Sequence, residues 1–167
     1  MANGRSMTVG APILPDGYIL DGVEQQLLPW EYVEERMRTA VNYWIGTVRP
    51  NGRPHVSPIW GIWHDGRFWF DGSPETRRGK NIAQNPHITV NLEDGTKVVI
   101  MEGVVTDLHD LSLEFRETLS EIYTTKYAAH GYSPGPETWE SGIYVTDIHT
   151  VLAWTQFGVD MTRWKFR

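Results

Sequence analysis

Three cations stand within four residues of one another in the stretch GSPETRRGKNIAQNP, residues 72–86. They are Arg77, Arg78 and Lys80, in a chain whose formal net charge is −6. Like charges repel, so this arrangement is unfavourable unless an anion compensates it. The residue types suit phosphate binding, because guanidinium and ammonium groups both bind phosphate. Whether the cluster forms such a site depends on the element that carries it.

The residues before the cluster predict the start of a helix. Ser73 suits an N-cap and Pro74 suits the first turn, where its missing N–H group costs nothing. The N-terminus of a helix carries partial positive charge, so Arg77 and Arg78 there cost a few tenths to about 1 kcal/mol each. A phosphate removes that cost, because the dipole, the free N–H groups and the guanidinium groups all favour it. From charge alone, a phosphate site and a solvated surface cluster fit this pattern equally well.

Other chemistries find little support in the sequence. The chain has no cysteine, which excludes disulfides, iron–sulfur clusters and thiolate–zinc sites. Its six histidines lack the spacing of a metal motif, and we expect Asp107 to cap a helix rather than to bind a metal. The acidic balance argues against nucleic-acid binding. We predict no metal site and assign no catalytic side chain, although His55 is the nearest candidate for an acid or base.

The hydropathy of the chain bears on its location. No apolar run approaches the ~20 residues that a membrane-spanning helix needs, and the N-terminal stretch lacks the apolar core of a signal peptide. Together with the missing cysteines, these features predict a cytoplasmic protein that has no membrane partner.

The rest of the chain must form the scaffold that positions the cluster. At 167 residues the sequence predicts one domain. Residues 1–27 are rich in Gly, Pro and Asp without a clear period, which predicts a flexible N-terminal arm before a domain at 28–167. The spacing of apolar residues predicts helices at 29–41, from Ser73 onward and from Leu108 to Tyr127.

Stretches rich in β-branched and aromatic residues predict six strands. They cover 42–48, 54–63, 68–72, 87–92, 97–105 and 142–157. Turn signals such as Asn51-Gly52 and Asp65-Gly66 join consecutive strands, which favours antiparallel pairing. A six-stranded antiparallel sheet tends to close into a barrel, because closure removes its edges. The predicted fold class is therefore mainly β with flanking α, a six-stranded antiparallel barrel.

Three motifs occur in an order that resembles a known family. They are IGTVRPNGRPHVSPIWGIWHDGRFWF, TRRGKNIAQNPHITVNL and AWTQFGVDMTRWKF, at 45–70, 76–92 and 153–166. Together they resemble the pyridoxamine 5′-phosphate oxidase-like proteins, the superfamily of split β-barrel flavin and deazaflavin oxidoreductases. The resemblance extends over about residues 30–167. It implies a split β-barrel that forms a homodimer, with two cofactors held at the subunit interface.

The resemblance also implies which residues hold the cofactor. Those that match the phosphate-binding motif of the family are Thr76, Arg77, Arg78 and Lys80. Those that match the strand lining the isoalloxazine ring, with its backbone groups and small side chains, are His55, Val56, Ser57, Pro58, Ile59 and Trp60. Residues near Trp154 and Trp164 would reach over from the other subunit.

Within the superfamily the cofactor is FMN, the deazaflavin coenzyme F420, or haem or biliverdin. F420 carries a glutamate tail beyond its phosphate and therefore needs further cations, which Arg49 and Arg53 supply. The sequence favours an oxidoreductase that transfers hydride between F420 and an unsaturated small organic substrate. An FMN-dependent enzyme of the same fold and a non-catalytic flavin- or haem-binding protein are the alternatives. Vitamin B6 oxidation is not expected, because the C-terminal cations of residues 163–167 stand in a different setting.

Overall fold

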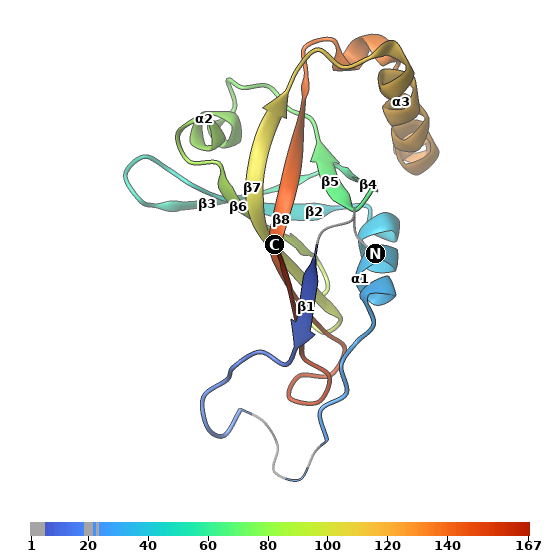
Figure 1. Cartoon of the computed structure of the whole chain (residues 1–167). Helices are drawn as coiled ribbons and strands as arrows, with labels where there is room; N and C mark the ends of the chain where they lie inside the picture. The colour runs from blue at the N-terminus through green and yellow to red at the C-terminus, as the bar shows by residue number, and fades with distance from the viewer. Residues whose placement is uncertain (1–5, 19–21, 23) are drawn as a thin grey trace.

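A computed structural model describes residues 6–18, 22 and 24–167, and within them nine strands and three α-helices. The strands are β1 (Met7–Gly10), β2 (Tyr43–Val48), β3 (Pro54–Ile59), β4 (Ile62–His64), β5 (Arg67–Phe70), β6 (His87–Leu92), β7 (Val98–Leu108), β8 (Ile143–Trp154) and β9 (Thr162–Phe166). The helices are α1 (Trp30–Thr39), α2 (Arg77–Gln84) and α3 (Leu113–Tyr127). All strand pairs are antiparallel, as the tight turns predicted, and the protein is mainly β (Figure 1).

A bend at Trp60-Gly61 closes the sheet into a barrel. β3 pairs with β2, β4 pairs with β5, β5 pairs with β8, and β7 and β6 lead back to β2. The predicted strand 54–63 is therefore two strands, because the chain changes partner at the bend. Gly61 is required there, since a Cβ atom would lie 2.5 Å from the ring of Phe68. The six predicted strands together form the closed barrel.

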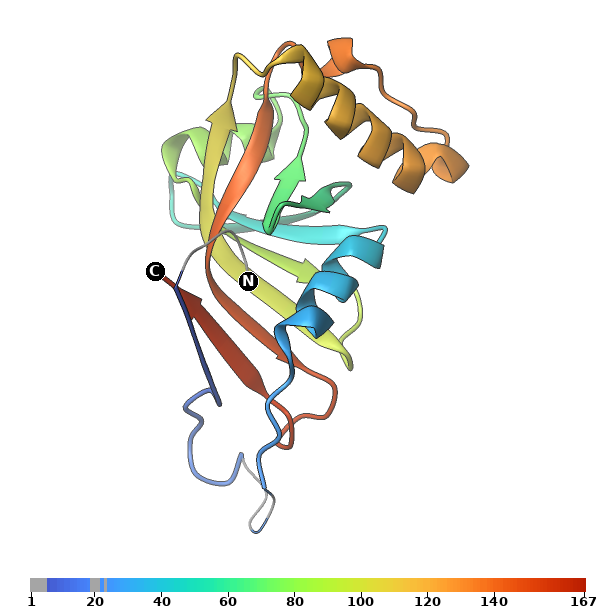
Figure 2. The same ribbon diagram turned by 45° about the vertical axis from the view of Figure 1, so that its right-hand side comes forward.

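β8 is shared between two neighbours, which splits the barrel at one edge. On this edge its first part pairs with β5, at Tyr144 to Thr146, and its second part pairs with β9, at Thr150 to Ala153. A register shift between Glu102 and Gly103 of β7 lies opposite the point of separation. The bulge re-aims the strand, so that β5 and β9 can leave β8 in different directions (Figure 2).

The ends of the chain form strands that the sequence did not predict. β1 lies in the stretch predicted as a flexible arm, and it pairs with β9 from Met7 opposite Phe166 to Gly10 opposite Arg163. A four-residue strand is too short to show a period, which is why composition alone indicated an arm. Residues 1–5, 19–21 and 23 of the predicted arm lie outside the described residues. The boundary at residue 27 stays a prediction.

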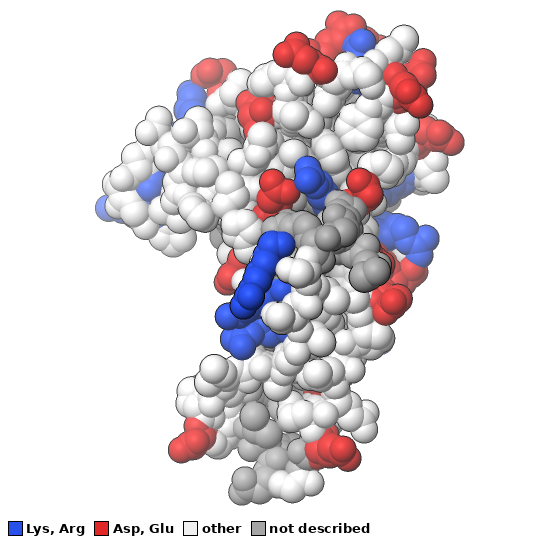
Figure 3. Space-filling view, in the orientation of Figure 1, with Lys and Arg blue, Asp and Glu red and all other residues white. Residues whose placement is uncertain are grey.

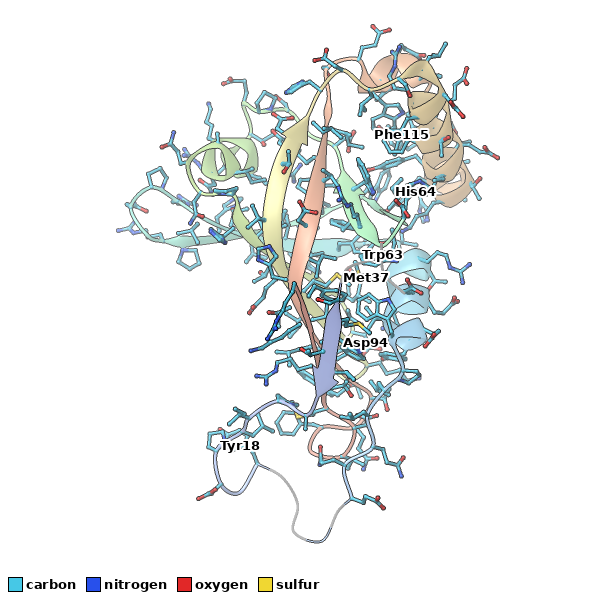
Figure 4. The ribbon with its side chains drawn as sticks, viewed as in Figure 1. Tyr18, Met37, Trp63, His64, Asp94 and Phe115 are labelled. Carbon is cyan, nitrogen blue, oxygen red and sulfur yellow. The ribbon has the colours of Figure 1, made fainter. Side chains whose placement is uncertain are left out.

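Two apolar clusters hold the helices on the barrel. Met37 and Trp63 lie between α1 and the sheet (Figure 4). Met37 belongs to the buried barrel cluster around Tyr43 and Val151, and the partly buried Trp63 packs against that cluster. A second cluster lies beneath α3, where the ring centroids of Phe115 and His64 are 6.1 Å apart (Figure 4). Its buried members are Ile62, Trp69, Leu119, Tyr123, Tyr127, Trp139, Ile143 and Val145. The helices therefore add apolar cover to a barrel whose interior is already packed.

The long helix begins later than predicted. Ser112 is its N-cap and accepts a hydrogen bond from the backbone N–H of Phe115 at 3.2 Å, so the helix begins at Leu113 and not at Leu108. Asp107 lies within β7 and caps nothing, so that expectation is wrong. Both Asp and Ser are good caps, and the apolar spacing did not separate them. No helix in the described ranges combines the length and apolarity needed to cross a bilayer.

Candidate functional site

The basic cluster lies at the first turn of α2, and this helix also begins later than predicted. Thr76 is the N-cap, with Oγ1 accepting from the N–H of Gly79 at 3.0 Å. Ser73 instead forms a turn, in which its Oγ accepts from the N–H of Glu75 at 3.1 Å. Arg77 and Arg78 are thus the first two helical residues, in a first turn without an acidic side chain. Their opposition to the helix dipole is stronger than the predicted start implied.

Arg78 is the cation that turns inward. Its guanidinium is half-buried, lies 5.8 Å from the ring centroid of Phe70 and donates to the carbonyl of Asp71 at 3.2 Å. Its Nε is buried, and no hydrogen-bond partner for it occurs among the described residues. Burial lowers the pKa of Arg78, while Asp71 and Tyr144 oppose that shift. A half-buried cation that spends one N–H on a carbonyl has unused donors for an anion.

Two glycines allow the chain to pack closely around this arginine. Gly72 has φ +152°, and a Cβ atom there would lie 2.3 Å from Nη2 of Arg78. Gly79 packs against the preceding turn, where a Cβ atom would lie 2.7 Å from Cα of Pro74. The missing side chains let the guanidinium cross the backbone and let α2 sit directly on the turn that precedes it.

Arg78 and the end of β3 line one hollow of about 320 Å³. Its lining residues are Pro58, Ile59, Trp60, Asp71, Gly72, Arg78 and Tyr132. The indole of Trp60 stacks on Tyr127 with ring centroids 4.8 Å apart, and the hydroxyl of Tyr132 donates to Asp71 at 3.0 Å. The structure therefore brings one predicted phosphate residue together with three of the predicted ring-contact residues.

The remaining ring-contact residues point to different sides of β3. Val56 is 58 % exposed and lies on the open face of the sheet, away from the barrel interior. His55 and Ser57 lie on the other face, where the Ser57 Oγ is buried and lacks a partner within the described part of the chain. Burial lowers the pKa of His55, and so do Arg49, Arg77 and Arg78. His55 is therefore close to the arginines of the cluster.

The other members of the predicted phosphate motif face outward. Lys80 forms an ion pair with Glu75 at 3.0 Å, and both side chains are exposed. Thr76 uses its hydroxyl to cap α2. Arg77 is exposed, and its positive charge lowers the pKa of His55. Within the described chain, the motif therefore contributes Arg78, which points inward, and Arg77, which is exposed and close to His55.

The two tryptophans expected to reach another subunit lie away from the hollow. Trp164 is 1 % exposed and packs against Trp30 with ring centroids 5.6 Å apart, so its ring lies in the core of its own chain. The expected reach of residues near it to another subunit stays a prediction. The alternation of β9 turns this ring inward, which an unpaired tail would not have done. Trp154 packs against Phe157 at the far end of β8. Its role across an interface stays a prediction.

Several residues of the site escaped prediction. Asp71 and Tyr132 line the hollow, and Asn81 and Thr47 form a buried hydrogen bond of 2.9 Å behind the cluster. Asn81 stands inside the motif RRGKNI and is completely buried. A polar residue on the inward face of a short helix is a signal that could have found it.

A second, larger hollow of about 580 Å³ lies beside His55, where β2, β3, β6, β7 and β8 meet. It includes three histidines, His55, His87 and His149, together with Glu102. In the described part of the chain, no group of three or more histidine or acidic side chains is arranged to hold a metal ion.

Comparison with known proteins places this architecture in a family. A family model for pyridoxamine 5′-phosphate oxidase matches residues 31–148. A pyridoxine/pyridoxamine 5′-phosphate oxidase from Bacteroides thetaiotaomicron is 43 % identical over 49 residues, which span 28 % of this chain and 22 % of that enzyme. This chain thus aligns with less than a quarter of the curated relative.

Solved structures share the fold. An F420 reductase superposes with a TM-score of 0.53 at 18 % identity, over 83 % of this chain and 98 % of that one. A FAD-binding protein from Mesorhizobium loti superposes with a TM-score of 0.59 at 17 % identity, over 83 % and 95 %. The split-barrel fold implied by the sequence motifs is confirmed. The family model covers well over half of the residues, and the chain belongs to the pyridoxamine 5′-phosphate oxidase family.

Proposed function

We propose that the chain is an oxidoreductase that binds coenzyme F420, with the phosphate of the cofactor on Arg78 and its ring along residues 58–60. The observation that carries this proposal is the half-buried guanidinium of Arg78, which lacks a carboxylate partner within the described residues and opens into a hollow. Matching the family model adds support, because its namesake substrate is a phosphate ester. When bound, a deazaflavin supplies hydride transfer to or from an unsaturated organic substrate.

The residues of this chain have binding and positioning roles in the proposed reaction. Arg78 would hold the phosphate by charge-assisted hydrogen bonds, and Gly72 leaves room for the guanidinium group of Arg78. Backbone groups at Pro58 and Ile59 would line the ring. Trp60 is fixed by its stacking on Tyr127 and by donation from its Nε1 to Asn42 at 3.2 Å. This rigid wall would exclude water from one side of the reacting ring.

The preference for F420 over FMN rests on charge beyond the phosphate. Arg49 and Arg53 lie on the hairpin between β2 and β3, and cations appear over this hairpin and over α2 in the surface view (Figure 3). The Nε of Arg49 is buried and unpaired in the described chain. A glutamate tail that leaves the phosphate would meet these arginines, whereas FMN ends at its phosphate. FMN in the same hollow is the alternative within this proposal.

Titration of tryptophan fluorescence with F420 and with FMN tests the proposal. We expect F420 to bind more tightly, and the Arg78→Ala variant to bind at least tenfold more weakly, a loss of about 1.4 kcal/mol. Lys80→Ala is the matched control, because Lys80 is exposed and paired with Glu75. If neither ligand binds the wild-type protein, or if Arg78→Ala costs less than tenfold, the proposed site is wrong.

A second candidate function, non-catalytic haem binding, has one observation in its favour. The larger hollow offers His55, His87 and His149 as axial ligands beside the apolar side chains of Val48 and Val56. A haem-binding protein would show a strong Soret band after purification or haem addition, and that band would shift in His87→Ala or His149→Ala. Bound FMN would instead show the flavin spectrum. F420 absorbs in the Soret region itself, and its fluorescence and lack of haem Q bands would distinguish it from haem.

A further inference from the structure

A buried polar chain links α2 to the barrel strand that carries His55. Asn81 donates from Nδ2 to Oγ1 of Thr47 at 2.9 Å, and this Oγ1 lies 3.3 Å from Nδ1 of His55. Asn81 is 0 % exposed and Thr47 is 3 % exposed. Burial of an amide and a hydroxyl is unfavourable unless they are hydrogen-bonded, so their presence here needs a reason.

Packing does not require polar side chains at these positions. Thr47 alternates with Tyr43 and Ile45 on the inward face of β2, and both of these side chains belong to the apolar barrel cluster. Apolar side chains of similar shape at both positions 47 and 81 would fill the space without a buried polar pair. Oδ1 of Asn81 is itself buried without a partner in the described residues. The Asn81–Thr47 pair is therefore better explained by a role in positioning a neighbouring side chain than by a role in core packing.

What the pair holds is the imidazole of His55, the cross-strand partner of Thr47. Burial lowers the pKa of His55, and the positive charges of Arg49, Arg77 and Arg78 lower it further. The hollow beside His55 adds His87, His149 and Glu102, from β6, β8 and β7, of which only the carboxylate would act in the opposite direction. These effects favour the neutral ring, which has a single N–H group to offer.

We propose that Thr47 and Asn81 are positioning residues, which orient His55 so that its Nε2–H joins the arginines in binding the anionic group of the cofactor. Asn81 donates to the Thr47 oxygen, whose own proton has two acceptors at 3.3 Å, Nδ1 and the backbone carbonyl of His55. In this proposal the proton goes to Nδ1. With Nδ1 as an acceptor, the ring proton resides on Nε2, at the opposite side of the ring. His55 then adds a directed hydrogen bond without adding a further positive charge. This inference rests on the proposed phosphate site.

The test compares Thr47→Val with Thr47→Ser, which removes and keeps the hydroxyl. Affinities are measured for FMN and riboflavin, and for F420 and its phosphate-free precursor. We expect Thr47→Val to weaken binding of the phosphorylated ligands about tenfold, the effect of losing one directed hydrogen bond to an anion. The phosphate-free ligands should be unaffected, and Thr47→Ser should bind like the wild type. Equal losses with and without the phosphate would overturn the proposal.

A double-mutant cycle separates positioning from a general structural effect. In a His55→Ala background, Thr47→Val should cause no further loss of affinity for the phosphorylated ligand. Thermal unfolding and near-UV circular dichroism check that each variant is folded. If Thr47→Val weakens binding as much without the imidazole as with it, the threonine does not act through His55 and the proposal is wrong.

A ligand-free measurement keeps this inference distinct from the proposed function. Long-range proton–nitrogen NMR of the histidine-labelled protein should show a neutral His55 with its proton on Nε2 in the wild type and in Thr47→Ser. Thr47→Val should show a mixture of both tautomers. A wild-type proton on Nδ1 overturns the proposal even if the cofactor binds. Failure of both F420 and FMN to bind the wild type would instead reject the phosphate site, and with it the anion-binding part of this role.

Discussion

At the scale of single residues, the candidate site depends on missing side chains as much as on charged ones. Arg78 can cross the backbone because residue 72 is glycine, and α2 can rest on its preceding turn because residue 79 is glycine. The sequence predicted the cation but not its surroundings. Two adjacent arginines are visible in a motif, whereas the residues that surround Arg78 come from the end of β3, the turn after β5 and the loop after α3.

The Gly72→Ala variant tests the close approach of Arg78 to the backbone at residue 72. The added methyl group would collide with the guanidinium of Arg78, which is flexible and would move, and the φ of +152° would strain the backbone slightly. We expect a small loss of stability and a loss of about tenfold in affinity for the phosphorylated cofactor, measured by fluorescence titration. Gly95→Ala is the control, since a Cβ atom there meets nothing within 4 Å. Unchanged affinity in Gly72→Ala would show that the position of Arg78 is unimportant.

Lys126 predicts a pH dependence of stability. Its ammonium group donates to Tyr43 and, at 3.1 Å, to the carbonyl of Gly61, and burial lowers its pKa to about 7. The unfolded chain binds this proton up to about pH 10.5, so between pH 7 and that value the unfolded state holds more protons than the folded state. Stability from this group therefore rises with pH across the window.

Urea unfolding at pH 7 and pH 9 checks the direction. The wild type should be more stable at pH 9, and Lys126→Met should be less dependent on pH and more stable than the wild type at pH 7. Lys97→Met, at an exposed position, should keep the pH dependence of the wild type. The buried tyrosines do not interfere below pH 9, because a free tyrosine ionises only near pH 10. An unchanged slope in Lys126→Met would contradict the assignment.

At the scale of elements, most of the barrel could be predicted and its closure could not. Alternation and turn signals located the strands from 42 to 157, because both signals depend only on residues that are close together in the sequence. The bend at Trp60-Gly61 depends on pairing with β5 and on the contact with the ring of Phe68. The alternation of residues within 54–63 shows neither of these contacts. The start of α2 was misplaced for a related reason, since Ser73 and Thr76 are both suitable caps.

Gly61→Ala should weaken the closure of the barrel. A methyl group would lie 2.5 Å from the ring of Phe68 and 2.7 Å from the carbonyl oxygen of Trp69, and neither can move far within the core. Overpacking of this kind lowers the free energy of unfolding by roughly 1–3 kcal/mol. Urea unfolding measures the loss, with Gly95→Ala as the unstrained control. A variant as stable as this control would mean that the bend tolerates a side chain.

At the scale of the whole molecule, the outer face of β2 and β3 is apolar and is left uncovered by the residues that the structure describes. Its side chains on β2 and β3 are Trp44, Val48, Pro54, Val56 and Pro58. Val56 is 58 % exposed, which is unusual for a valine inside a strand. We propose that a second copy of the chain covers this face, as the family resemblance implied. The residues that face a partner follow from strand alternation, but the partner itself leaves no mark on a single sequence.

Val56→Asp tests the proposed dimer. A carboxylate in the centre of an apolar interface would be buried without a partner, so we expect the wild type to be a dimer and the variant a monomer by light scattering. Leu113→Asp is the control, since Leu113 lies on α3 and is exposed to nearly the same degree, 57 %. A wild type that is monomeric at working concentration, or a Val56→Asp variant that stays dimeric, would place the interface elsewhere.

The smaller hollow has a mechanical consequence for the barrel. Its lining comes from the end of β3, the turn between β5 and α2, and the loop after α3, three segments far apart along the chain. A ligand that contacts all three segments would link them and stabilise this end of the barrel as one unit. Its binding should slow amide hydrogen exchange in these segments together, while β1 and β9 at the other end continue to open at their own rate.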